Sequence, residues 1–530
     1  MIRVFEAARL IASKNLTVLD VRRFEDRQFR EYCTPIVKRV CSSCLGTLNS
    51  SKMKCQGEGC ELKDVVCEKG TNSEQTVIYS FSIRKQLERV LKNQIKEIIE
   101  THQYHHDLKA NNLEHDDLSS VHKSRRYSEN IESTAEFQEG ILKLPVSLAY
   151  DGFRPSNLSK DEVTPLYLRV EGIRKIRKET EESVILCAVH SGPKGVSHKN
   201  ADLFGNRLRN EVADIRNDNI IIFFDNKQWN IEIVVIMAML DLKGSRLVSG
   251  YPNWYDISGC AHCTIRGVRV GTASVSFVCG SSTHPRSREE VRRLLEENSK
   301  LNSLSLLVNP KDHPIDELHV VAEGLYKRIL FDIVGKSDFW KELKVSPRVV
   351  KELDSSLALI KSHAGFRTQF GRLTKLGRMS GSQLKQTTRI VIILLAATDV
   401  YQDVSLKMFL LCIVAYVDIC YTIQSVHDIP SLKNIGEVLK MYIRRLHSDN
   451  CNYKSHLLID HSVENILAYG NFSGTSTAPF EKCHRLISIG YNQYATSVNN
   501  MCKKFEIGNR KKSEVSQPRL SASRKFIENL

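Results

Sequence analysis

The stretch Leu144-Pro-Val-Ser-Leu-Ala-Tyr-Asp151-Gly-Phe-Arg-Pro155 joins an apolar run directly to an acidic residue and a turn. Residues 144–150 have the β-branched, Leu and aromatic content of a buried strand, whereas the Asp, Gly and Pro that follow favour a turn. An Asp turned outward at the end of a strand is well placed to hold a cation, although many such residues are only turn formers. We therefore predict a strand here, with Asp151 as a candidate metal ligand at its carboxyl end.

Short apolar runs continue on the C-terminal side of this strand. Three of them are bounded by Gly, Pro, Asn or Asp and have strand-like composition; they cover residues 166–170, 183–190 and 219–224. A helical stretch at about 201–216 separates the last two, and the apolar segment 230–240 suits either a strand or a helix. This order predicts an α/β or α+β domain built on a mixed sheet.

Two more acidic residues occupy positions comparable to that of Asp151. Asp241 ends the apolar run 231–240, and Glu323 begins a later helical stretch. Carboxylates on strand ends and a helix can together hold two divalent metals, which activate a water or a 3′-hydroxyl and stabilise the leaving oxygen of a phosphodiester. Asp225, which ends the preceding strand-like run, is a rival for the second position, and on spacing alone a role as turn formers is the simpler explanation for all of them.

Cysteines form a compact group near the N-terminus. Cys41-Ser-Ser-Cys44 is followed by Cys55 and Cys60, and two sulfur pairs at this spacing suit a tetrahedral zinc site. Bound zinc would order a module that is too small for a hydrophobic core of its own. Cys67 is either a spare thiol or an alternative fourth ligand, and a set of coincidental free thiols is the simpler alternative.

The overall composition favours an intracellular protein with a polyanionic partner. Lys and Arg outnumber Asp and Glu by 76 to 61, which gives a net charge of +15 and favours DNA or RNA, although a basic surface can also be merely solvated. The longest apolar stretches, 390–397 and 408–417, are too short to span a bilayer, and no signal peptide is visible in 1–19. We therefore expect no membrane partner, and we expect the fifteen cysteines to be thiols or metal ligands rather than disulfides.

Changes of pattern divide the chain into segments. The polar residues 101–140 contain five histidines at irregular spacing, which favours a hydrated linker over a metal-binding tract. The predicted segments are an N-terminal segment 1–32, a zinc-binding Cys-rich module 33–70, an amphipathic basic helix within 71–100, the polar linker 101–140, the sheet domain 141–335 with its own Cys-x-x-Cys insertion, a mainly helical part 336–505 and a disordered basic tail 506–530.

Eight short motifs follow one another in an order that resembles the CACTA-type (En/Spm-like) transposases. They are similar to the family's Asp-Gly-Pro block, Gly-Pro-Lys element, second acidic block, Gly-Cys-x-x-Cys, His-containing helix, start of the helical part, His-rich helix and Phe-Glu box. In this chain the motifs occupy, in the same order, 148–155, 191–194, 239–242, 259–263, 319–325, 378–383, 456–461 and 478–484. The chain departs from the family at Leu242-Lys243-Gly244, where Pro and Ala are usual, and between 263 and 310.

The resemblance implies an RNase H-like core that cuts and joins DNA ends with Mg²⁺. Carried over by motif, the catalytic acids are Asp151, Asp241 and Glu323. The resemblance also implies a zinc-stabilised excursion between the second and third acids, held by Cys260 and Cys263, with His319 as a candidate further ligand. A single Cys-x-x-Cys needs two distant ligands, and a redox role lacks the thioredoxin context. Two residues of the last motifs, His461 and Glu481, are either functional or structural.

These observations predict a nuclear, transposase-like protein that binds transposon ends. The expected chemistry is DNA strand cleavage and transfer by two metal ions, with structural Zn²⁺ and catalytic Mg²⁺. The alternative is a domesticated, transposase-derived nuclear protein that binds DNA or protein without catalysis, and a zinc-dependent protein adaptor is a weaker third possibility. Whether the chain is an active enzyme, and whether it forms a homo-oligomer, stay open at this point.

Overall fold

The computed structural model of the chain describes residues 35–48, 54–67, 75–113, 116–154, 162–173, 183–193, 195–196, 198–253, 255–270, 274–277, 284–360, 370–447 and 451–489. The predicted N-terminal segment 1–32 and the predicted disordered tail 506–530 lie outside them.

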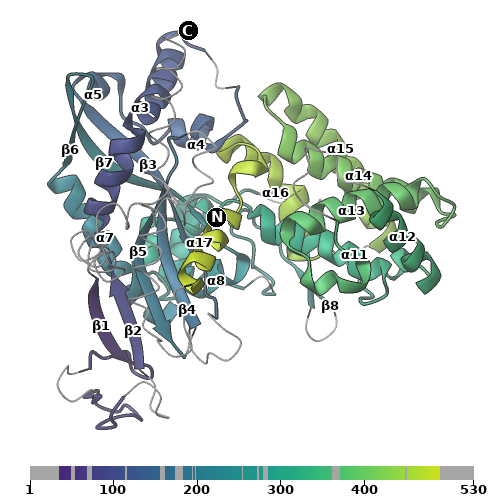
Figure 1. Cartoon of the computed structure of the whole chain (residues 1–530), viewed down its shortest axis with the longest axis horizontal. Coiled ribbons are helices and arrows are strands. Elements are labelled where there is room, and N and C mark those ends of the chain that lie inside the picture. The colour runs from purple at the N-terminus through teal and green to yellow at the C-terminus, as the bar shows by residue number, and fades with distance from the viewer. Residues whose placement is uncertain are drawn as a thin grey trace, which may run out of the picture.

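Within the described ranges, a seven-stranded mixed sheet contains the strand that precedes Asp151 (Figure 1). Its strands lie side by side in the order β1-β2-β5-β4-β3-β7-β6, and every neighbouring pair is antiparallel except β3 and β7, which run parallel. The prediction of a mixed α/β structure is confirmed, and the ambiguous segment 230–240 is mostly strand. The strands are β1 (Ile36–Cys41), β2 (Gln75–Ser80), β3 (Ile141–Tyr150), β4 (Glu162–Val170), β5 (Val184–Gly192), β6 (Ile220–Phe224) and β7 (Lys227–Met239).

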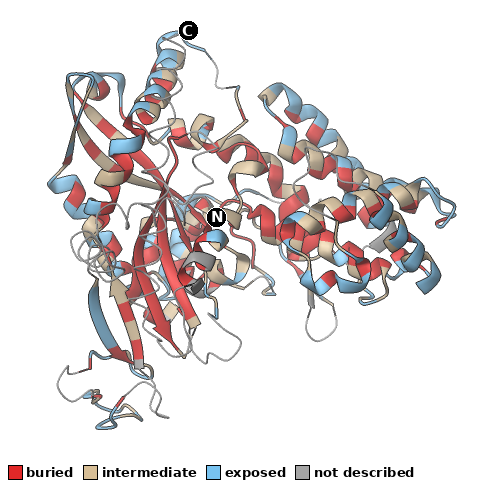
Figure 2. Cartoon of the chain, viewed as in Figure 1, coloured by how far each residue is buried: buried red, intermediate tan, exposed pale blue. Residues whose placement is uncertain are grey.

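Both faces of the sheet are covered at its centre, which explains why its central strands are largely apolar. All nine residues of β5 are buried, and Figure 2 shows the central strands almost entirely in the colour of buried residues. Successive residues of β3 point to opposite faces, so that Leu148 packs with α3 and α7, whereas Ala149 packs with α17. These three helices are α3 (Ile83–Ala110), α7 (Ala201–Asn217) and α17 (Ala478–Ile489).

Residues 101–140, for which we predicted a hydrated linker, contain helices and buried side chains instead. Helix α3 continues to Ala110, well beyond the predicted end of the basic helix at residue 100, and His102, His105 and His106 in its last turns are buried. The polar composition was misleading because these rings find hydrogen-bond partners inside the protein. The segment also contains η1 (Val121–Lys123), α4 (Arg125–Ser128) and α5 (Thr134–Gln138).

A chain excursion with short helices and strands connects β7 to the helical part. It contains α8 (Leu242–Ser249), β8 (Val268–Val270), β9 (Ser274–Ser276), α9 (Arg288–Glu297), α10 (Ser303–Leu307) and η4 (Pro310–Asp312). Strands β8 and β9 form a separate two-stranded sheet. The excursion begins directly after Asp241, and its helix α10 packs against α7 beside the large sheet.

The helical part packs around a core of its own, separate from the cores beside the sheet. Helix α17 is the exception, because its buried face returns to the sheet. The helices are η5 (Leu318–Tyr326), α11 (Lys327–Ile333), α12 (Pro347–Leu359), α13 (Gly381–Ala396), α14 (Val404–Thr422), α15 (Ile429–His447) and α16 (Tyr453–Tyr469). Short 3₁₀ turns occur at η3 (His198–Asn200), η6 (Lys341–Leu343), η7 (Leu373–Arg378), η8 (Val426–Asp428) and η9 (Phe472–Gly474).

Among the described residues, helix α14 alone has the length and apolar composition of a membrane span. It has 19 residues and a mean hydropathy of 1.9, so this apolar segment is longer than the sequence suggested. The helix packs against α13 and α15, and 44% of its apolar window is buried. Phe409 and Ile413 are among the α14 residues that enter the core of the helical part.

Candidate metal centres and acidic site

Strands β3 and β7 place two acidic residues side by side at one edge of the sheet. The strands run parallel with Ala149 opposite Met239, and Asp151 and Asp241 each follow two residues later. The carboxyl ends of adjacent parallel strands meet at the same edge, so both aspartates lie there. Asp241 also caps helix α8, because its Oδ1 accepts a hydrogen bond from the backbone N–H of Gly244.

Asp225, the rival for the second acidic position, lies at the opposite end of β7. Asp225 and Asn226 form the tight turn between β6 and β7, with φ values of +50° and +58°. Asp and Asn tolerate this left-handed conformation, which suits a two-residue hairpin turn. The 13 residues of β7 then span roughly 40 Å before the chain reaches Asp241. Asp225 therefore takes no part in the acidic site.

Helices η5 and α17 bring further charged groups to the two aspartates. Nδ1 of His319 lies 2.5 Å from Oδ2 of Asp316, and its Nε2 lies 3.8 Å from Oε1 of Glu481. Thr477 fixes Asp316, because its backbone N–H and its hydroxyl donate to the two carboxylate oxygens at 3.0 and 2.9 Å. Although burial opposes the charge, the hydrogen bond to Asp316 raises the pKa of His319 to about 9. A cationic imidazole thus lies among the acids at neutral pH.

The acids at this edge are desolvated and repel one another. Burial raises the pKa of Asp151 to about 7; the charges of Asp241 and Glu481 add to this rise, and that of His319 opposes it. Burial likewise raises the pKa of Glu481 to about 7, despite the charge of His319. Carboxylates with raised pKa values in one small region are typical of functional sites.

Glu323, the predicted third acid, lies beside this group on η5. It lines a pocket of about 680 Å³ together with Asp241 and His319, and its charge contributes to the raised pKa of Glu481. The carboxylates whose charges raise the pKa of Asp151 are Asp241 and Glu481. The structure therefore offers Glu481 as a second candidate for the third acid. The sequence signal for Glu481 was its place in the motif 478–484, which alone could not separate a functional from a structural role.

Cys260 and Cys263 meet two histidines of helix α16 in a buried Cys/His group. Sγ of Cys260 lies 3.4 Å from Nε2 of His456 and 3.5 Å from Nε2 of His461, and Sγ of Cys263 lies 3.6 Å from Nε2 of His456. The two Nε2 atoms are 3.2 Å apart. Tetrahedral zinc, with bonds of about 2.3 Å to sulfur and about 2.0 Å to nitrogen, requires S···N distances of about 3.5 Å and N···N distances of about 3.3 Å. The group can therefore bind zinc.

Carboxylates lie behind both histidines of this Cys/His group. Nδ1 of His456 is 2.8 Å from Oδ2 of Asp460, and Nδ1 of His461 is 3.8 Å from Oε2 of Glu464. Lys440 in turn lies 3.0 Å from the other oxygen of Asp460. Such contacts orient the rings of metal-binding histidines and leave Nε2 free to face the metal.

Two arginines tie the Cys/His group to its surroundings. Nε of Arg286 donates to the carbonyl oxygens of both cysteines, at 3.2 and 3.0 Å. Arg246, on the same helix that Asp241 caps, donates to the hydroxyl of Tyr453 at 2.7 Å. Because Tyr453 is the first residue of α16, which carries both histidines, the metal centre and the acidic edge share a connected set of buried contacts.

The prediction of His319 as a ligand of this group is wrong, because its ring pairs with Asp316 at the acidic edge. The true partners of the cysteines, His456 and His461, are separated by four residues, which is within the spacing usual for paired zinc-binding histidines. That spacing was visible in the sequence. What the sequence did not show is that α16 folds back onto a loop almost two hundred residues earlier.

The structure brings the four predicted N-terminal ligands together. Sγ of Cys41 lies 3.8 Å from Sγ of Cys60, and Sγ of Cys44 lies 3.4 Å from Sγ of Cys55; tetrahedral zinc requires about 3.8 Å. Cys41 is the last residue of β1, so this four-cysteine group is anchored at the end of an edge strand. The module around it has a small core of its own, and the group can bind zinc.

Cysteines outside these two groups behave in different ways. Cys67, the alternative fourth ligand, is buried against the four-cysteine group without belonging to it. Cys187, Cys420 and Cys483 are buried free thiols. Cys451 is disulfide-bonded, which contradicts the prediction that no cysteine would be. Pairing depends on which thiols the fold brings within bonding distance, and a count of cysteines does not contain that information.

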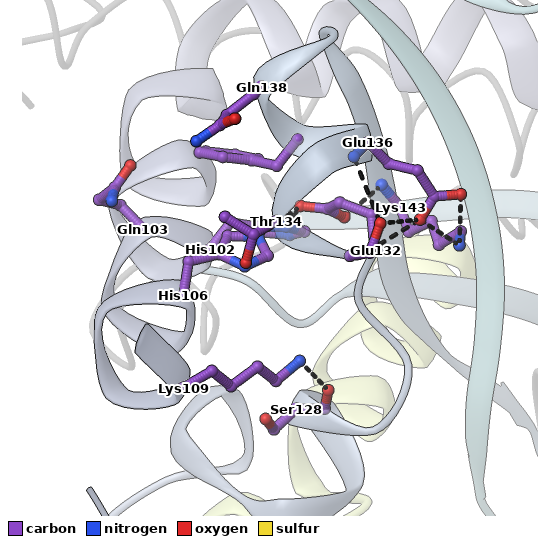
Figure 3. A network of polar contacts seen from close by, with 12 residues as sticks. His102, Gln103, His106, Lys109, Ser128, Glu132, Thr134, Glu136, Gln138 and Lys143 are labelled. Carbon is purple, nitrogen blue, oxygen red and sulfur yellow. Dashed lines mark hydrogen bonds and ion pairs between the residues drawn. The ribbon is translucent and has the colours of Figure 1, made fainter. Parts of the chain in front are cut away.

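A third group of potential metal ligands, at the end of α3, is better explained by hydrogen bonding (Figure 3). Nδ1 of His102 lies 2.5 Å from Oε1 of Glu132, and Nε2 of His106 lies 3.3 Å from the same oxygen. The second oxygen of Glu132 accepts from the backbone N–H of Lys143. A separation of 2.5 Å suits a hydrogen bond and is shorter than the roughly 3.3 Å between two ligands of one tetrahedral metal. The network therefore fastens α3 to the start of β3.

Buried neutral histidines should make the protein less stable in acid. Burial lowers the pKa of His190, on β5, to about 4. The unfolded chain takes up this proton below pH 6.5, so the stability that depends on neutral His190 is lost as the pH falls from about 6.5 to 4. Because glutamine does not titrate, we expect His190→Gln to remove this pH-dependent part of the stability. Between pH 7 and 4.5 the free energy of unfolding of the wild type should fall by about 2–3 kcal/mol more than that of the variant, measured by urea unfolding followed by circular dichroism.

The comparison of two proteins at two pH values isolates His190. Acids with raised pKa values, such as Asp151, stabilise the protein as the pH falls, which is the opposite of the effect of His190. Their contribution is the same in wild type and variant, so it cancels in the comparison. The exposed His427 offers a matched control, and His427→Gln should follow the wild type at both pH values. Equal losses in the wild type and His190→Gln would show that His190 does not stay neutral in the folded protein.

Comparison with known proteins adds no family to these observations: no family model matches the chain, and no curated protein matches it. The site is thus characterised by its geometry. Two adjacent aspartates and two glutamates lie around a cationic histidine. A buried Cys/His group lies nearby, and its helix α16 also lines the pocket beside these acids.

Proposed function

We propose that this chain is a CACTA-type, transposase-like enzyme that binds DNA and cleaves and transfers its strands. The observation that carries the proposal is the pairing of Asp151 and Asp241 beyond the carboxyl ends of the parallel strands β3 and β7. The motif resemblance assigns these two residues to catalysis from sequence alone, and they are neighbours in space although far apart in the chain. A chance likeness between short motifs would not require this proximity.

The sheet supports an RNase H-like core as the scaffold of this proposal. Strands β3, β4 and β5 form an antiparallel meander, and β7 then runs parallel to β3 after a connection that contains α7. The two strands that carry the aspartates are therefore neighbours in the interior of the sheet, covered on both faces. Rigid strands of this kind hold side chains at their ends more precisely than mobile loops do.

The acidic edge has the donors that divalent cations prefer. Mg²⁺ binds carboxylate oxygens, so Asp151, Asp241 and a third carboxylate would hold it. Bound there, Mg²⁺ would polarise the scissile phosphate and help to deprotonate the attacking water or 3′-hydroxyl. The chain itself orients these groups: Gly244 fixes the Asp241 carboxylate, and Asp316 holds His319 toward Glu481.

The third carboxylate can be identified by comparing two substitutions. We expect Glu481→Gln to lower the rate of Mg²⁺-dependent nicking by about 10²-fold, the size typical of losing one electrostatic contact to the transition state. Glu323→Gln should have a smaller effect, because Glu481 is the glutamate whose charge adds to the raised pKa of Asp151. Initial rates on supercoiled plasmid, measured for both variants at the same Mg²⁺ concentration, make the comparison. The opposite ranking would restore Glu323 as the third acid.

The experiment that tests the function is Mg²⁺-dependent nicking of supercoiled plasmid by the purified full chain. We expect open-circular product with Mg²⁺ or Mn²⁺ and none with EDTA. Protein that is folded by circular dichroism and binds DNA, but produces no nicks with either metal, would refute the enzymatic proposal.

DNA binding without nicking would favour the alternative, a nuclear transposase-derived protein that binds DNA without catalysis. The four-cysteine module at the end of β1 and the exposed Lys85, Lys92 and Lys96 on α3 favour this candidate, because neither feature belongs to the acidic edge. Contacts from lysines to phosphates release counterions, so such binding would weaken steeply with salt.

A further inference from the structure

We propose that the pocket beside Asp241 and Glu323 binds the sugar-phosphate backbone of a DNA strand next to the bond that is cut. This inference rests on the proposed function and adds to it the place where the strand lies. The pocket has a volume of about 680 Å³, within the range of pockets that hold a nucleotide-sized ligand. Its walls come from α8, from η5 and α11, and from the first turn of α16.

Positive side chains dominate the walls of this pocket. Five of its lining residues are Lys or Arg, against two carboxylates, and the cationic ring of His319 lines it as well; the five are Lys243, Lys327, Arg328, Lys336 and Lys454. Within the described part of the chain, Lys243, Lys327 and Lys336 have no ion-pair partner. The ammonium groups of these three residues are therefore available to an anionic ligand.

Two of the five cations are held in place by neutral partners. Nζ of Lys454 donates to the carbonyl oxygen of His319 at 2.7 Å, and burial lowers its pKa. The guanidinium of Arg328 lies over the ring of Phe339, 5.1 Å from its centroid, and donates to the hydroxyl of Ser337 at 3.2 Å. Neither partner cancels the positive charge, so both groups are oriented and remain attractive to phosphate.

The position of the pocket favours a nucleic-acid strand over other anions. Asp241 and Glu323 form part of the wall, whereas Asp151 and Glu481 do not line it. The pocket therefore opens on one side of the acidic edge, where a strand would continue after passing the acids. Phe331 also lines it and offers an aromatic ring, on which a base can stack. The carboxylates of an acidic peptide would use the lysines but would gain nothing from this ring.

The test is a double substitution, Lys327→Gln with Lys336→Gln, in the full chain. Binding of a short fluorescein-labelled single strand should weaken roughly tenfold, and the slope of log affinity against log salt should fall by about 1.4 in magnitude, the value for two lost phosphate contacts on a single strand. Fluorescence anisotropy over a series of salt concentrations gives both quantities. The control is Lys341→Gln with Lys351→Gln, which removes the same charge from exposed positions outside the pocket and should behave as wild type.

The outcomes separate this inference from the proposed function. The pocket variant could bind DNA with the affinity and salt slope of the wild type while the wild type nicks DNA. That result would overturn the pocket assignment and leave the enzymatic proposal intact. If the pocket variant loses DNA binding and the wild-type protein does not nick DNA, the pocket assignment is supported and the enzymatic proposal is refuted. A poly-glutamate competitor that binds more tightly than the oligonucleotide would overturn the assignment to a nucleic-acid strand.

Discussion

Asp151→Asn is expected to abolish Mg²⁺-dependent nicking while leaving DNA binding nearly unchanged. The substitution keeps the size and shape of the side chain but removes the charge that a divalent cation needs, so the nicking rate should fall on the order of 10³-fold or more. Asp151 lies at the edge of the sheet and does not line the pocket that contains the lysines, so the affinity for DNA should change little. Plasmid nicking rates and fluorescence anisotropy on the same preparations measure the two quantities.

Asp225 provides a matched control for this substitution. Asp225→Asn makes the same chemical change at the far end of β7, in a turn whose left-handed conformation Asn also tolerates. It should nick DNA at the wild-type rate. Residual nicking by Asp151→Asn within a few-fold of that control would show that Asp151 does not hold the metal, and the active site would have to lie elsewhere.

The strands of the sheet were predictable because their signal is local. The run before Asp151 and the three runs that follow are apolar and bounded by turn residues; they form the buried strands β3, β4 and β5 and the more exposed edge strand β6. The segment 230–240 stayed ambiguous because only its first half alternates, with Ile231 and Ile233 buried, whereas residues 236–239 are buried throughout and have no period-two pattern to distinguish them from a buried helix. Once β7 is known to run parallel to β3, Asp241 follows as the neighbour of Asp151.

The ligands that sequence reasoning missed depend on distant contacts. His456 and His461 reach the Cys-x-x-Cys loop only because α16 packs against the excursion after β7. Glu481 reaches Asp151 only because α17 leaves the helical part and returns to the sheet. The polar histidines of α3 were assigned to a linker for a similar reason, because their partner Glu132 is supplied by a later turn of the chain. Local pattern gives the elements, and the partners come from the tertiary fold.

Cys263→Ser is expected to remove one of two bound zinc ions and to loosen the contact between α16 and the excursion after β7. A structural zinc site contributes about 10–16 kcal/mol of binding free energy, and serine is a much poorer ligand than thiolate. The loss should therefore lower the melting temperature of the whole chain and make the 451–489 region more sensitive to protease. Zinc content per chain, thermal unfolding and limited proteolysis measure these effects.

Cys44→Ser is the control that separates the two metal centres. It should also reduce the zinc content from two to one, but it should leave the main thermal transition close to that of wild type, because the four-cysteine module packs in a small core of its own. Cys412→Ser, which alters a half-buried thiol outside both groups, should retain two zinc ions. Equal destabilisation by Cys263→Ser and Cys44→Ser would mean that the four-cysteine module is coupled to the rest of the fold. Full zinc content in Cys263→Ser would remove the assignment of zinc to the Cys/His group.

Because Arg246 joins α8 to the first residue of α16, loss of the zinc bound by the Cys/His group should also disturb the pocket beside Asp241 and reduce the nicking rate. Cys44→Ser should not reduce it.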